Sequence, residues 1–233
     1  IPEGLTCTLD VDIALGTGSG TAMTVNGTLD LPSTSAAGTY GFTLTGNVAG
    51  TGTISAGTSG TALPNNVIYD IEFSGAFGFT GVLLFSLYCT HPTNKIIYLS
   101  GAEAAGQTEL SVDTDVTGDI WAEGDLIRID DITTTADSEI REIAAGGIAA
   151  GAITVTSGLT NAKTSGSYVT RVTRNIMIRG GKAHVIQAFA DGSYIRAAII
   201  PSASNYHGIL YQSTNSITFD GVISGGGRSL YRV

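Results

Sequence analysis

Hydrophobic and polar residues alternate along most of this chain, in short runs separated by glycine, asparagine, proline and serine. Alternation with a period of two is typical of β-strands that bury one face, and the separating residues are typical of turns. No apolar period of about 3.6 residues runs long enough for a helix of about three turns, although residues 140–148 fit a short helix. The pattern therefore predicts an all-β protein.

The first hundred residues read as successive strands joined by small turns. Short phrases recur between the strands, VNGTL at 25–29, LTGNV at 44–48 and GTGTI at 50–54, and each leads into a new strand. Such close but irregular recurrence is typical of the stacked coils of a β-solenoid. The expected strands are 6–15, 21–31, 40–48, 50–55, 67–73, 81–89 and 95–99.

One related strand occurs three times in the last third of the chain, at a spacing of about twenty residues, which is typical of solenoid rungs. A polar side chain, Asn175, Ser193 or Ser216, lies at or just before the start of each copy. We expect these side chains to hydrogen-bond the backbone of a turn, and a ladder of stacked asparagines is the alternative. The three copies are 176–180, 194–200 and 217–223.

The middle of the chain has a different character, because its acid content rises and its strands are short. Strands joined by Gly, Asp and Asn turns fit a small antiparallel barrel or sandwich, with Trp121 in its core. We therefore predict coils of a right-handed parallel β-helix, or β-solenoid, over 1–100 and 173–233, with a small antiparallel β-barrel or sandwich module inserted over 101–172. The expected strands of the module are 108–112, 121–129, 139–143, 152–156 and 168–172.

Charge narrows the range of partners. The chain has 20 Asp and Glu against 11 Lys and Arg, which gives a formal net charge of −9. Nucleic acids and anionic membranes attract surplus Lys and Arg, so we expect neither as a partner. No apolar stretch reaches the roughly 18 residues that membrane insertion requires. Residues 171–233 are nevertheless locally basic, with seven Arg or Lys against two Asp.

The two ends of the chain lie inside the strand pattern, since the chain opens at Ile1 without a leading turn and stops within a strand near Val233. The ends of a solenoid need to be covered. We therefore expect either a longer parent polypeptide or a neighbouring chain, and exposed strand edges favour association with identical subunits.

The opening resembles a known family. IPEGLTCTLD at 1–10 and MTVNGTL at 23–29 look like the start of the glycine-rich extracellular domain that is named for its eight glycines. That resemblance implies a parallel β-helix in a large surface protein, and some members of the family are linked to polysaccharide degradation. It covers about the first thirty residues, and its motifs concern the fold.

The middle part is similar to small β-modules of phage virion proteins and bacterial surface proteins, on the residues 104–110, 124–129 and 156–162. Both resemblances imply an extracellular location on a virion or cell surface. The function we expect is that of a non-catalytic structural or attachment protein, such as a segment of a fibre, spike, decoration protein or adhesin. Its partners would be identical subunits or a larger surface assembly, and its exposed turns would contact polysaccharide.

A polysaccharide-degrading β-helix enzyme, either a glycosidase or a lyase, is the alternative function. Asp191, His207 and Asp220 are its candidate catalytic residues, because a pair of carboxylates can act as acid and base in glycoside cleavage. Each Asp also stands beside a glycine, as is usual in turns. The two interpretations therefore stay open.

Aromatic and basic residues surround these positions in the sequence. Tyr194, Arg196, Tyr206 and Tyr211 are the candidate glycan contacts, since tyrosine combines an apolar ring face with a polar tip. They would serve glycan binding whether or not the chain catalyses a reaction.

A calcium-stabilised adhesin module is a third interpretation. Asp113, Asp115 and Asp119 stand in an Asp-x-Asp-x-Thr-Gly-Asp order that matches the opening of a calcium-binding loop. The twelfth position of that loop, however, is Gly124, where a bidentate carboxylate is required. A solvated acidic turn is the alternative, and we expect no other cofactor.

The two cysteines, Cys7 and Cys89, permit at most one intramolecular disulfide. Two free thiols are the alternative, because sequence alone does not show whether the sulfur atoms meet. The sequence contains no zinc signature, no phosphate-binding glycine loop and no nucleophile elbow.

Overall fold

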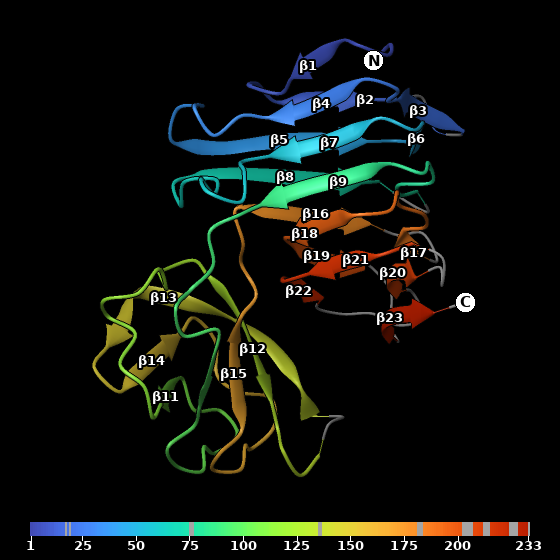
Figure 1. Cartoon of the computed structure of the whole chain (residues 1–233). Helices are drawn as coiled ribbons and strands as arrows, with labels where there is room; N and C mark the ends of the chain where they lie inside the picture. The colour runs from blue at the N-terminus through green and yellow to red at the C-terminus, as the bar shows by residue number, and fades with distance from the viewer. Residues whose placement is uncertain are drawn as a thin grey trace. The chain divides into compact units, whose positions relative to one another are not determined.

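The structure is a computed structural model of residues 1–233. It describes the chain except for residues 17, 19, 75–76, 135–136, 181–183, 202–206, 212–214, 224–227 and 233, and it describes only the backbone at 184, 207, 210, 211, 222 and 228–232. The chain divides into two compact units (Figure 1). Unit 1 comprises Ile1–Thr90 and Arg174–Val233, and unit 2 comprises His91–Thr173.

Unit 1 is built on two six-stranded parallel sheets. Each strand pairs with a strand from the next passage of the chain, so that Cys7, Leu29, Ile54 and Phe85 lie side by side on successive strands. Figure 1 shows the strands of each sheet lying one above another. The first sheet has the order β1 (Thr6–Thr8), β4 (Thr28–Leu31), β7 (Thr53–Ala56), β9 (Leu84–Tyr88), β18 (Ser193–Arg196) and β21 (Ile217–Phe219). The second sheet has the order β2 (Ile13–Leu15), β5 (Gly38–Leu44), β8 (Val67–Phe73), β16 (Ile176–Gly180), β19 (Ala198–Pro201) and β22 (Val222–Ile223).

A third set of parallel pairs follows the same succession. The strands β3 (Thr21–Thr24) and β6 (Asn47–Ala49) pair at one end, and β17 (His184–Ile186), β20 (His207–Tyr211) and β23 (Arg228–Arg232) pair at the other. Phe79 joins them, because it forms single parallel bridges with Val48 and with Ile186. The chain thus visits the three sets in turn. The described residues contain no α-helix, which confirms the all-β prediction.

The three related copies in the last third are aligned differently from the prediction. The first copy, 176–180, lies wholly in the second sheet, where Met177 pairs with Ala198. The second and third copies each turn a corner, so that Tyr194 pairs with Thr218 in the first sheet and Ala198 pairs with Val222 in the second. A similar apolar run therefore covers one strand in the first copy and two short strands in the other copies.

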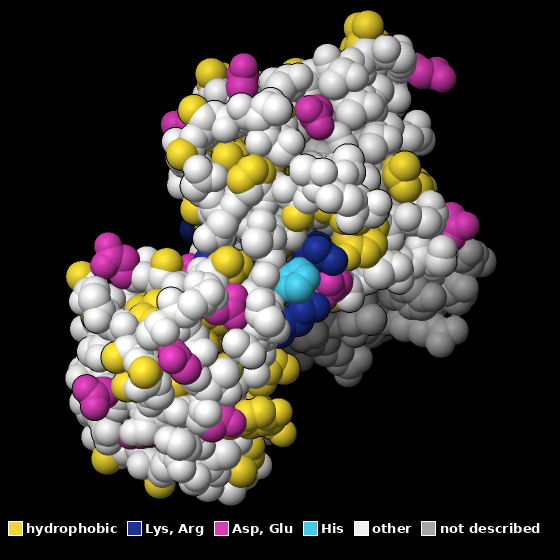
Figure 2. Space-filling view, turned by 60° about the vertical axis from the view of Figure 1, so that its left-hand side comes forward, with side chains coloured by type: hydrophobic (Ala, Val, Ile, Leu, Met, Phe, Trp, Pro, Cys, Tyr) yellow, Lys and Arg dark blue, Asp and Glu magenta, His cyan; other side chains and the backbone are white. Residues whose placement is uncertain are grey.

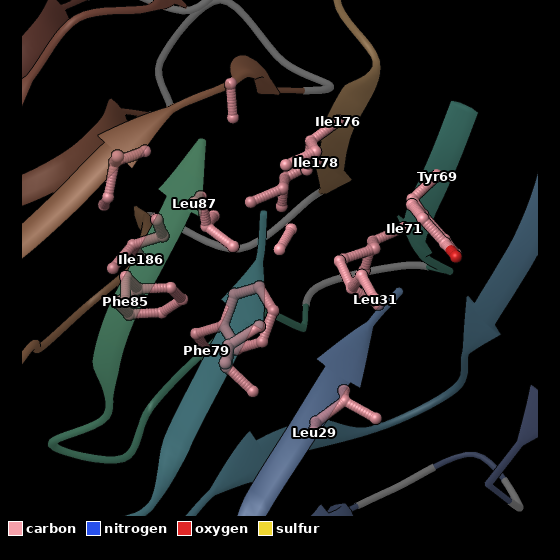
Figure 3. Close-up of a cluster of buried hydrophobic side chains, with 14 of the residues drawn as sticks. Leu29, Leu31, Tyr69, Ile71, Phe79, Phe85, Leu87, Ile176, Ile178 and Ile186 are labelled. Atoms are coloured by element: carbon pink, nitrogen blue, oxygen red, sulfur yellow. The ribbon is translucent and has the colours of Figure 1, made fainter. Parts of the chain in front are cut away.

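The core of unit 1 lies between these sheets (Figure 3). Alternate residues of each strand point inward, as in β8, where Val67, Tyr69, Ile71 and Phe73 are all buried. The Phe79 ring contacts two other rings edge-on, that of Phe73 at 5.0 Å and that of Phe85 at 5.3 Å between centroids. Burial of each such side chain stabilises the fold by roughly 1.5–3 kcal/mol. The period of two along the sequence is thus the alternation between core and surface.

The recurring glycine phrases form corners where successive passages of the chain come very close together. A Cβ atom on Gly52 would collide with the backbone oxygen of Gly27, and one on Gly81 would collide with the backbone oxygen of Gly50. Gly50 also has φ of 117°, a conformation that L side chains rarely adopt. Glycine is required at these corners because backbone occupies the space of a side chain.

The polar residues at the starts of the three copies bind turn backbone, as predicted. Asn175 Nδ2 donates to the carbonyl oxygens of Pro64 at 2.7 Å and Val67 at 3.0 Å. Ser193 Oγ donates to the Ala190 carbonyl at 2.8 Å, and Ser216 Oγ accepts from the Gly192 amide at 3.3 Å. Ile176 pairs with Tyr69 of β8, and the residue before Tyr69 is Ile68, so no asparagine of β8 stacks beside Asn175.

Unit 2 is an antiparallel sheet that closes on itself. At the two edges of the sheet, Leu99 and Val112 form an antiparallel bridge, and the Ser100 amide donates to the Ser111 carbonyl at 2.9 Å. The closed sheet surrounds a core that includes Trp121, which is 5% exposed. The strand order is β10 (Ile96–Tyr98), β15 (Tyr168–Arg171), β12 (Leu126–Asp130), β13 (Glu139–Ala149), β14 (Ala152–Val155) and β11 (Glu109–Ser111).

One local prediction fails in unit 2. The strand expected over 95–99 does not join the N-terminal coils, because β10 pairs with β15 of this unit. Residues 140–148, which also fit a short helix, are part of β13, whose register shifts between Ile143 and Ile148. The irregular pairing there explains why the apolar spacing departs from a period of two.

Buried ion pairs hold the unit 2 strands together. The Asp125 carboxylate binds the Arg171 guanidinium in a bidentate manner, with Nε–Oδ2 of 2.6 Å and Nη2–Oδ1 of 2.8 Å. Both side chains are about 95% buried, at 5% and 6% exposure. Glu139 pairs with Lys163, whose side chain is fully buried, and with Arg141. Burying these charged groups costs desolvation energy, which the partner's charge offsets. Removal of one partner would leave a buried charge uncompensated and would therefore destabilise unit 2.

Of the two alternatives left open for the cysteines, the disulfide is not formed: Cys7 is exposed, Cys89 is buried, and they do not bridge each other. Cys7 lies on β1 and Cys89 directly follows β9, and two further strands, β4 and β7, separate β1 from β9. Three strand spacings put the two Cα atoms at least about 14 Å apart, well beyond the roughly 7 Å that a disulfide tolerates.

In the described part of the chain, no helix has the length and apolar character to cross a bilayer.

Candidate functional site

The outward face of the first sheet gathers aromatic and charged side chains on its later strands. The inward residues Leu31, Ala56, Leu87 and Ile195 are buried in the core. The residues next to them on each strand point outward, because successive side chains of a strand point to opposite faces of the sheet. Four of these outward residues form what we call the tyrosine–arginine cluster: Tyr88 on β9, Tyr194 and Arg196 on β18, and Asp220 directly after β21.

The two tyrosine rings of the cluster stack on each other. Tyr88 lies opposite Arg196 in the pairing of β9 with β18, so that Tyr194 lies diagonally across from it. The ring centroids are 4.3 Å apart and the ring planes are inclined by 13°. Both side chains are only partly buried. The pair therefore forms a half-exposed aromatic surface on an otherwise polar sheet face.

Arg196 connects the tyrosines to the acidic group. Its guanidinium carbon lies 5.5 Å from the centroid of the Tyr194 ring, within the range of a cation–π contact. Nη2 donates to the Tyr194 hydroxyl at 2.6 Å, and Nε donates to Asp220 Oδ2 at 3.1 Å. The Arg196 and Asp220 side chains remain 21% and 29% exposed. Apolar ring faces thus lie beside charged donors and acceptors that are open to solvent.

An open hollow of about 280 Å³ lies at the ends of β4 and β7 on the same sheet. Asp30 contributes to its wall, and Ser55 Oγ donates to Asp30 Oδ1 at 2.8 Å. Successive pairings place Asp30, Ser55, Ser86 and Tyr194 in one row across the sheet, so the hollow and the cluster are about 14 Å apart. Hydroxyl, carboxylate and aromatic groups therefore follow one another along this face. The other wall residues are Pro32, Ser33, Thr34, Gly57, Thr58 and Thr61.

The two candidate catalytic carboxylates are not brought together. β18 pairs with β21 from Ser193 opposite Ile217 to Ile195 opposite Phe219, so Asp191 precedes this pairing and Asp220 follows it. Asp191 binds Ser216, just before β21, and Asp220 directly follows β21, so the two carboxylates are roughly 13 Å apart along that strand, whereas paired glycosidase carboxylates are about 5–9.5 Å apart. His207 lies on β20, among the strands of the third set, and its side chain is outside the described part of the chain. The two carboxylates are therefore not paired with each other, and a role for His207 stays a prediction.

Asp191 caps a turn. Its Oδ1 accepts hydrogen bonds from the Ser216 hydroxyl and the Ser216 amide, both at 2.6 Å. These bonds lower the pKa of the Asp191 carboxyl below its ordinary value, the hydroxyl bond most strongly. The carboxylate thus joins two successive passages of the chain and is poorly suited to act as a proton donor.

The predicted calcium loop is also not formed. Asp113 accepts from the Tyr98 amide at 3.0 Å, Asp115 from the Thr117 amide at 2.9 Å, and Asp119 from the Asn94 amide at 2.8 Å. Each carboxylate thus caps a different stretch of backbone. Across the described residues, no three Asp, Glu, His or Cys side chains gather as a metal site. Figure 2 shows acidic side chains scattered singly over the visible face.

The candidate glycan contacts are partly gathered. Tyr194 and Arg196 belong to the tyrosine–arginine cluster, whereas Tyr211 lies on β20, away from the first sheet, and its side chain is outside the described residues. Tyr206 also falls outside them. Sequence reasoning did not find Tyr88, because it ends a strand far from Tyr194 in the chain. Only the pairing of β9 with β18 brings the two rings together.

Comparison with known proteins gives structural neighbours only. No family model and no curated protein matches this chain, so the resemblance to the eight-glycine domain has no support. Three solved phage structures are similar: the tailspike protein gp49 of Pseudomonas phage LKA1, the tailspike gp61 of Pseudomonas phage phi297, and the Gp54 tailspike of Acinetobacter baumannii bacteriophage AP22 in complex with A. baumannii capsular saccharide.

These three similarities are distant. The identities are 16%, 13% and 16%, the TM-scores are 0.30, 0.31 and 0.31, and the matches cover 78%, 80% and 79% of this chain. The chain spans well under half of each neighbour, namely 30%, 39% and 41% of their lengths. Similarity at this level carries no argument about function, which has to come from the residues themselves.

Proposed function

We propose that this chain is a non-catalytic structural or attachment element, exposed on a virion or cell surface, that contacts polysaccharide through the outward face of the first sheet. Within this proposal, the parallel strands of unit 1 are rungs of a right-handed parallel β-helix. Their regular stacking gives a stiff surface on which side chains from distant parts of the sequence stand in rows.

The tyrosine–arginine cluster is the observation that carries the proposal. A sugar ring has an apolar face and a polar rim. The stacked Tyr88 and Tyr194 rings offer an apolar face, and the Arg196–Asp220 pair offers a donor and an acceptor beside it. Polar groups placed precisely around an apolar surface are the usual basis of ligand specificity.

The row arrangement of the site favours contact with a long chain of sugars over a small molecule. The cluster and the hollow beside Asp30 lie in one row of side chains across successive strands. A polysaccharide that follows this row would meet a new strand about every 4.8 Å. Each contact would be weak, and many contacts in series would give the affinity.

Binding to an array of bacterial surface polysaccharides tests the proposal. Tyr194→Ala should weaken binding to any retained polysaccharide by about tenfold, as loss of a central aromatic contact does. Arg179→Ala is the control, because Arg179 on β16 belongs to the second sheet, has a side chain that is 43% exposed, and forms an ion pair with Asp70. Equal losses in both variants, or no loss in either, would contradict the proposal.

Association with identical subunits is a second part of the proposal. Parallel sheets end in strands with unpaired backbone groups, and such edges favour pairing with other chains. Light scattering across a range of protein concentrations tests this directly. A particle with the mass of one chain at every concentration would remove identical subunits from the account.

A further inference from the structure

The outward face of unit 2 carries exposed apolar and aromatic side chains that the proposed function does not use. Tyr98 and Tyr168 lie opposite each other on β10 and β15, with ring centroids 5.4 Å apart and planes inclined by 58°. They are 42% and 43% exposed, and Ile132 nearby is 46% exposed. Large side chains left this open in one region often mark a binding site.

A hollow of about 370 Å³ lies beside the Tyr168 ring. This volume is at the lower end of the range for small-molecule sites, about 300–1,000 Å³. Arg128 and Asp130 of β12 line it, and Asp130 pairs with Tyr168 in the register of β12 with β15. The other wall residues are Asp131, Ile132 and Ser138.

The polar groups of this hollow bind each other but keep hydrogen-bonding capacity for a ligand. Arg128 Nε donates to Asp130 Oδ1 at 2.7 Å, with the two side chains 34% and 28% exposed. A guanidinium has five N–H donors and a carboxylate has two acceptor oxygens, so this bond leaves donors and one carboxylate oxygen for a ligand. Tyr168 adds a ring and a hydroxyl. The hollow thus presents a donor and an acceptor side by side next to an aromatic surface.

Asp131 fixes the wall of the hollow. Its carboxylate accepts hydrogen bonds from the Thr133 and Thr134 amides and from the Thr164 amide, at 2.8, 2.8 and 2.7 Å. The Thr133 hydroxyl also donates to it, at 2.5 Å. The wall is therefore preorganised, which lowers the entropy cost of binding.

The charge of the hollow decides which ligand it can take. Two carboxylates, Asp130 and Asp131, face one guanidinium, Arg128, so an anionic ligand would meet net repulsion. A neutral saccharide unit fits, because its hydroxyls can use the donor and acceptor of the Arg128–Asp130 pair while its apolar face lies on Tyr168. We propose that unit 2 holds a binding site for a neutral saccharide at Tyr98, Arg128, Asp130 and Tyr168. This site is independent of the one on the first sheet.

Nuclear magnetic resonance of the whole chain, with ¹³C-labelled tyrosine rings, tests this site separately from the first sheet. The probes are methyl β-glucoside, methyl β-galactoside and methyl N-acetyl-β-glucosaminide, with methyl β-glucuronide as the anionic counterpart. At least one neutral glycoside should shift the Tyr98 and Tyr168 signals with a Kd in the millimolar range, as expected for a single sugar. The glucuronide should bind more weakly.

Variants decide whether the hollow is responsible. Tyr168→Ala and Asp130→Ala should each weaken binding of that glycoside by about tenfold. Ile96→Ala should not, because Ile96 is an even more exposed side chain on β10 that lies outside the hollow. The site would be overturned if no neutral glycoside shifts these signals, if the glucuronide binds best, or if Tyr168→Ala changes nothing. Concentration-dependent self-association that Tyr168→Ala abolishes, without sugar binding, would instead identify the face as a contact between copies. A result confined to Tyr88 and Tyr194 signals would support the first-sheet proposal alone.

Discussion

Tyr88 and Tyr194 stack at 4.3 Å between ring centroids although the whole of unit 2 lies between them in the sequence. The parallel pairing of β9 with β18 creates this contact. The cluster therefore forms only because the chain, after unit 2, returns to the first sheet and pairs β18 with β9.

The corner glycines should be intolerant of a side chain. Gly52→Ala places a Cβ against the backbone oxygen of Gly27, so we expect the free energy of unfolding to fall by about 1–3 kcal/mol, as for overpacking. Gly60→Ala is the control, because no heavy atom lies within 4 Å of its Cβ position and its φ is not positive. Denaturant unfolding measures both variants. Equal stability of the two would show that the corner is not closely packed.

The buried ion pair of unit 2 should be sensitive to loss of one partner. Asp125→Ala leaves the Arg171 guanidinium buried at 5% exposure without its bidentate acceptor. We expect the unfolding free energy of unit 2 to fall by about 3–5 kcal/mol. Asp130→Ala breaks a pair that is 34% and 28% exposed, so it should cost at most about 1 kcal/mol. Similar costs, measured by denaturant unfolding, would contradict the burial of the first pair.

Stability should fall in acid. Burial raises the pKa of Glu139. The hydrogen bond and the charge interaction with Lys163, together with the hydrogen bond from the Thr160 amide, outweigh this effect, so the pKa lies below the ordinary 4.5. The unfolded chain then binds protons at a higher pH than the folded chain does, so this contribution is present above about pH 4.5 and is lost as the pH falls further. Glu139→Gln should weaken the acid dependence of unit 2 melting. An unchanged pH profile in this variant would exclude Glu139 as the cause.

The two thiols should differ in reactivity. Cys7 is exposed and Cys89 is buried, and a thiol reagent needs access to the thiolate. One thiol per chain should react under native conditions and two after unfolding, and Cys7→Ser should remove the native reaction. No native reaction in the unreduced protein, with two thiols gained on reduction, would instead indicate a disulfide.

Much of the fold follows from local pattern. The period of two predicted the buried and exposed faces of strands such as β8, and the turn residues Asn175, Ser193 and Ser216 make the expected backbone bonds. These features depend on residues close together in the sequence. The positions of the corner glycines could be predicted from the sequence for the same reason. The contact between successive passages of the chain that requires glycine there could not.

The remaining features depend on alignment between distant strands. The copy at 176–180 looks like those at 194–200 and 217–223, yet it lies in one sheet where the others span two, because apolar alternation does not mark a corner. The sequence likewise does not show how far Asp191 lies from Asp220. Asp191 precedes the paired part of β18 and Asp220 follows β21, and no local signal in the sequence shows that separation.

Hydrogen–deuterium exchange of the chain with a retained polysaccharide is the most direct test of glycan contact by the first sheet. Protection should increase in peptides that cover β9 (Leu84–Tyr88) and β18 (Ser193–Arg196), and Tyr194→Ala should remove that increase. Protection confined to the second sheet, around β5 and β8, or no change in any peptide of unit 1 while the polysaccharide is bound, would contradict the account.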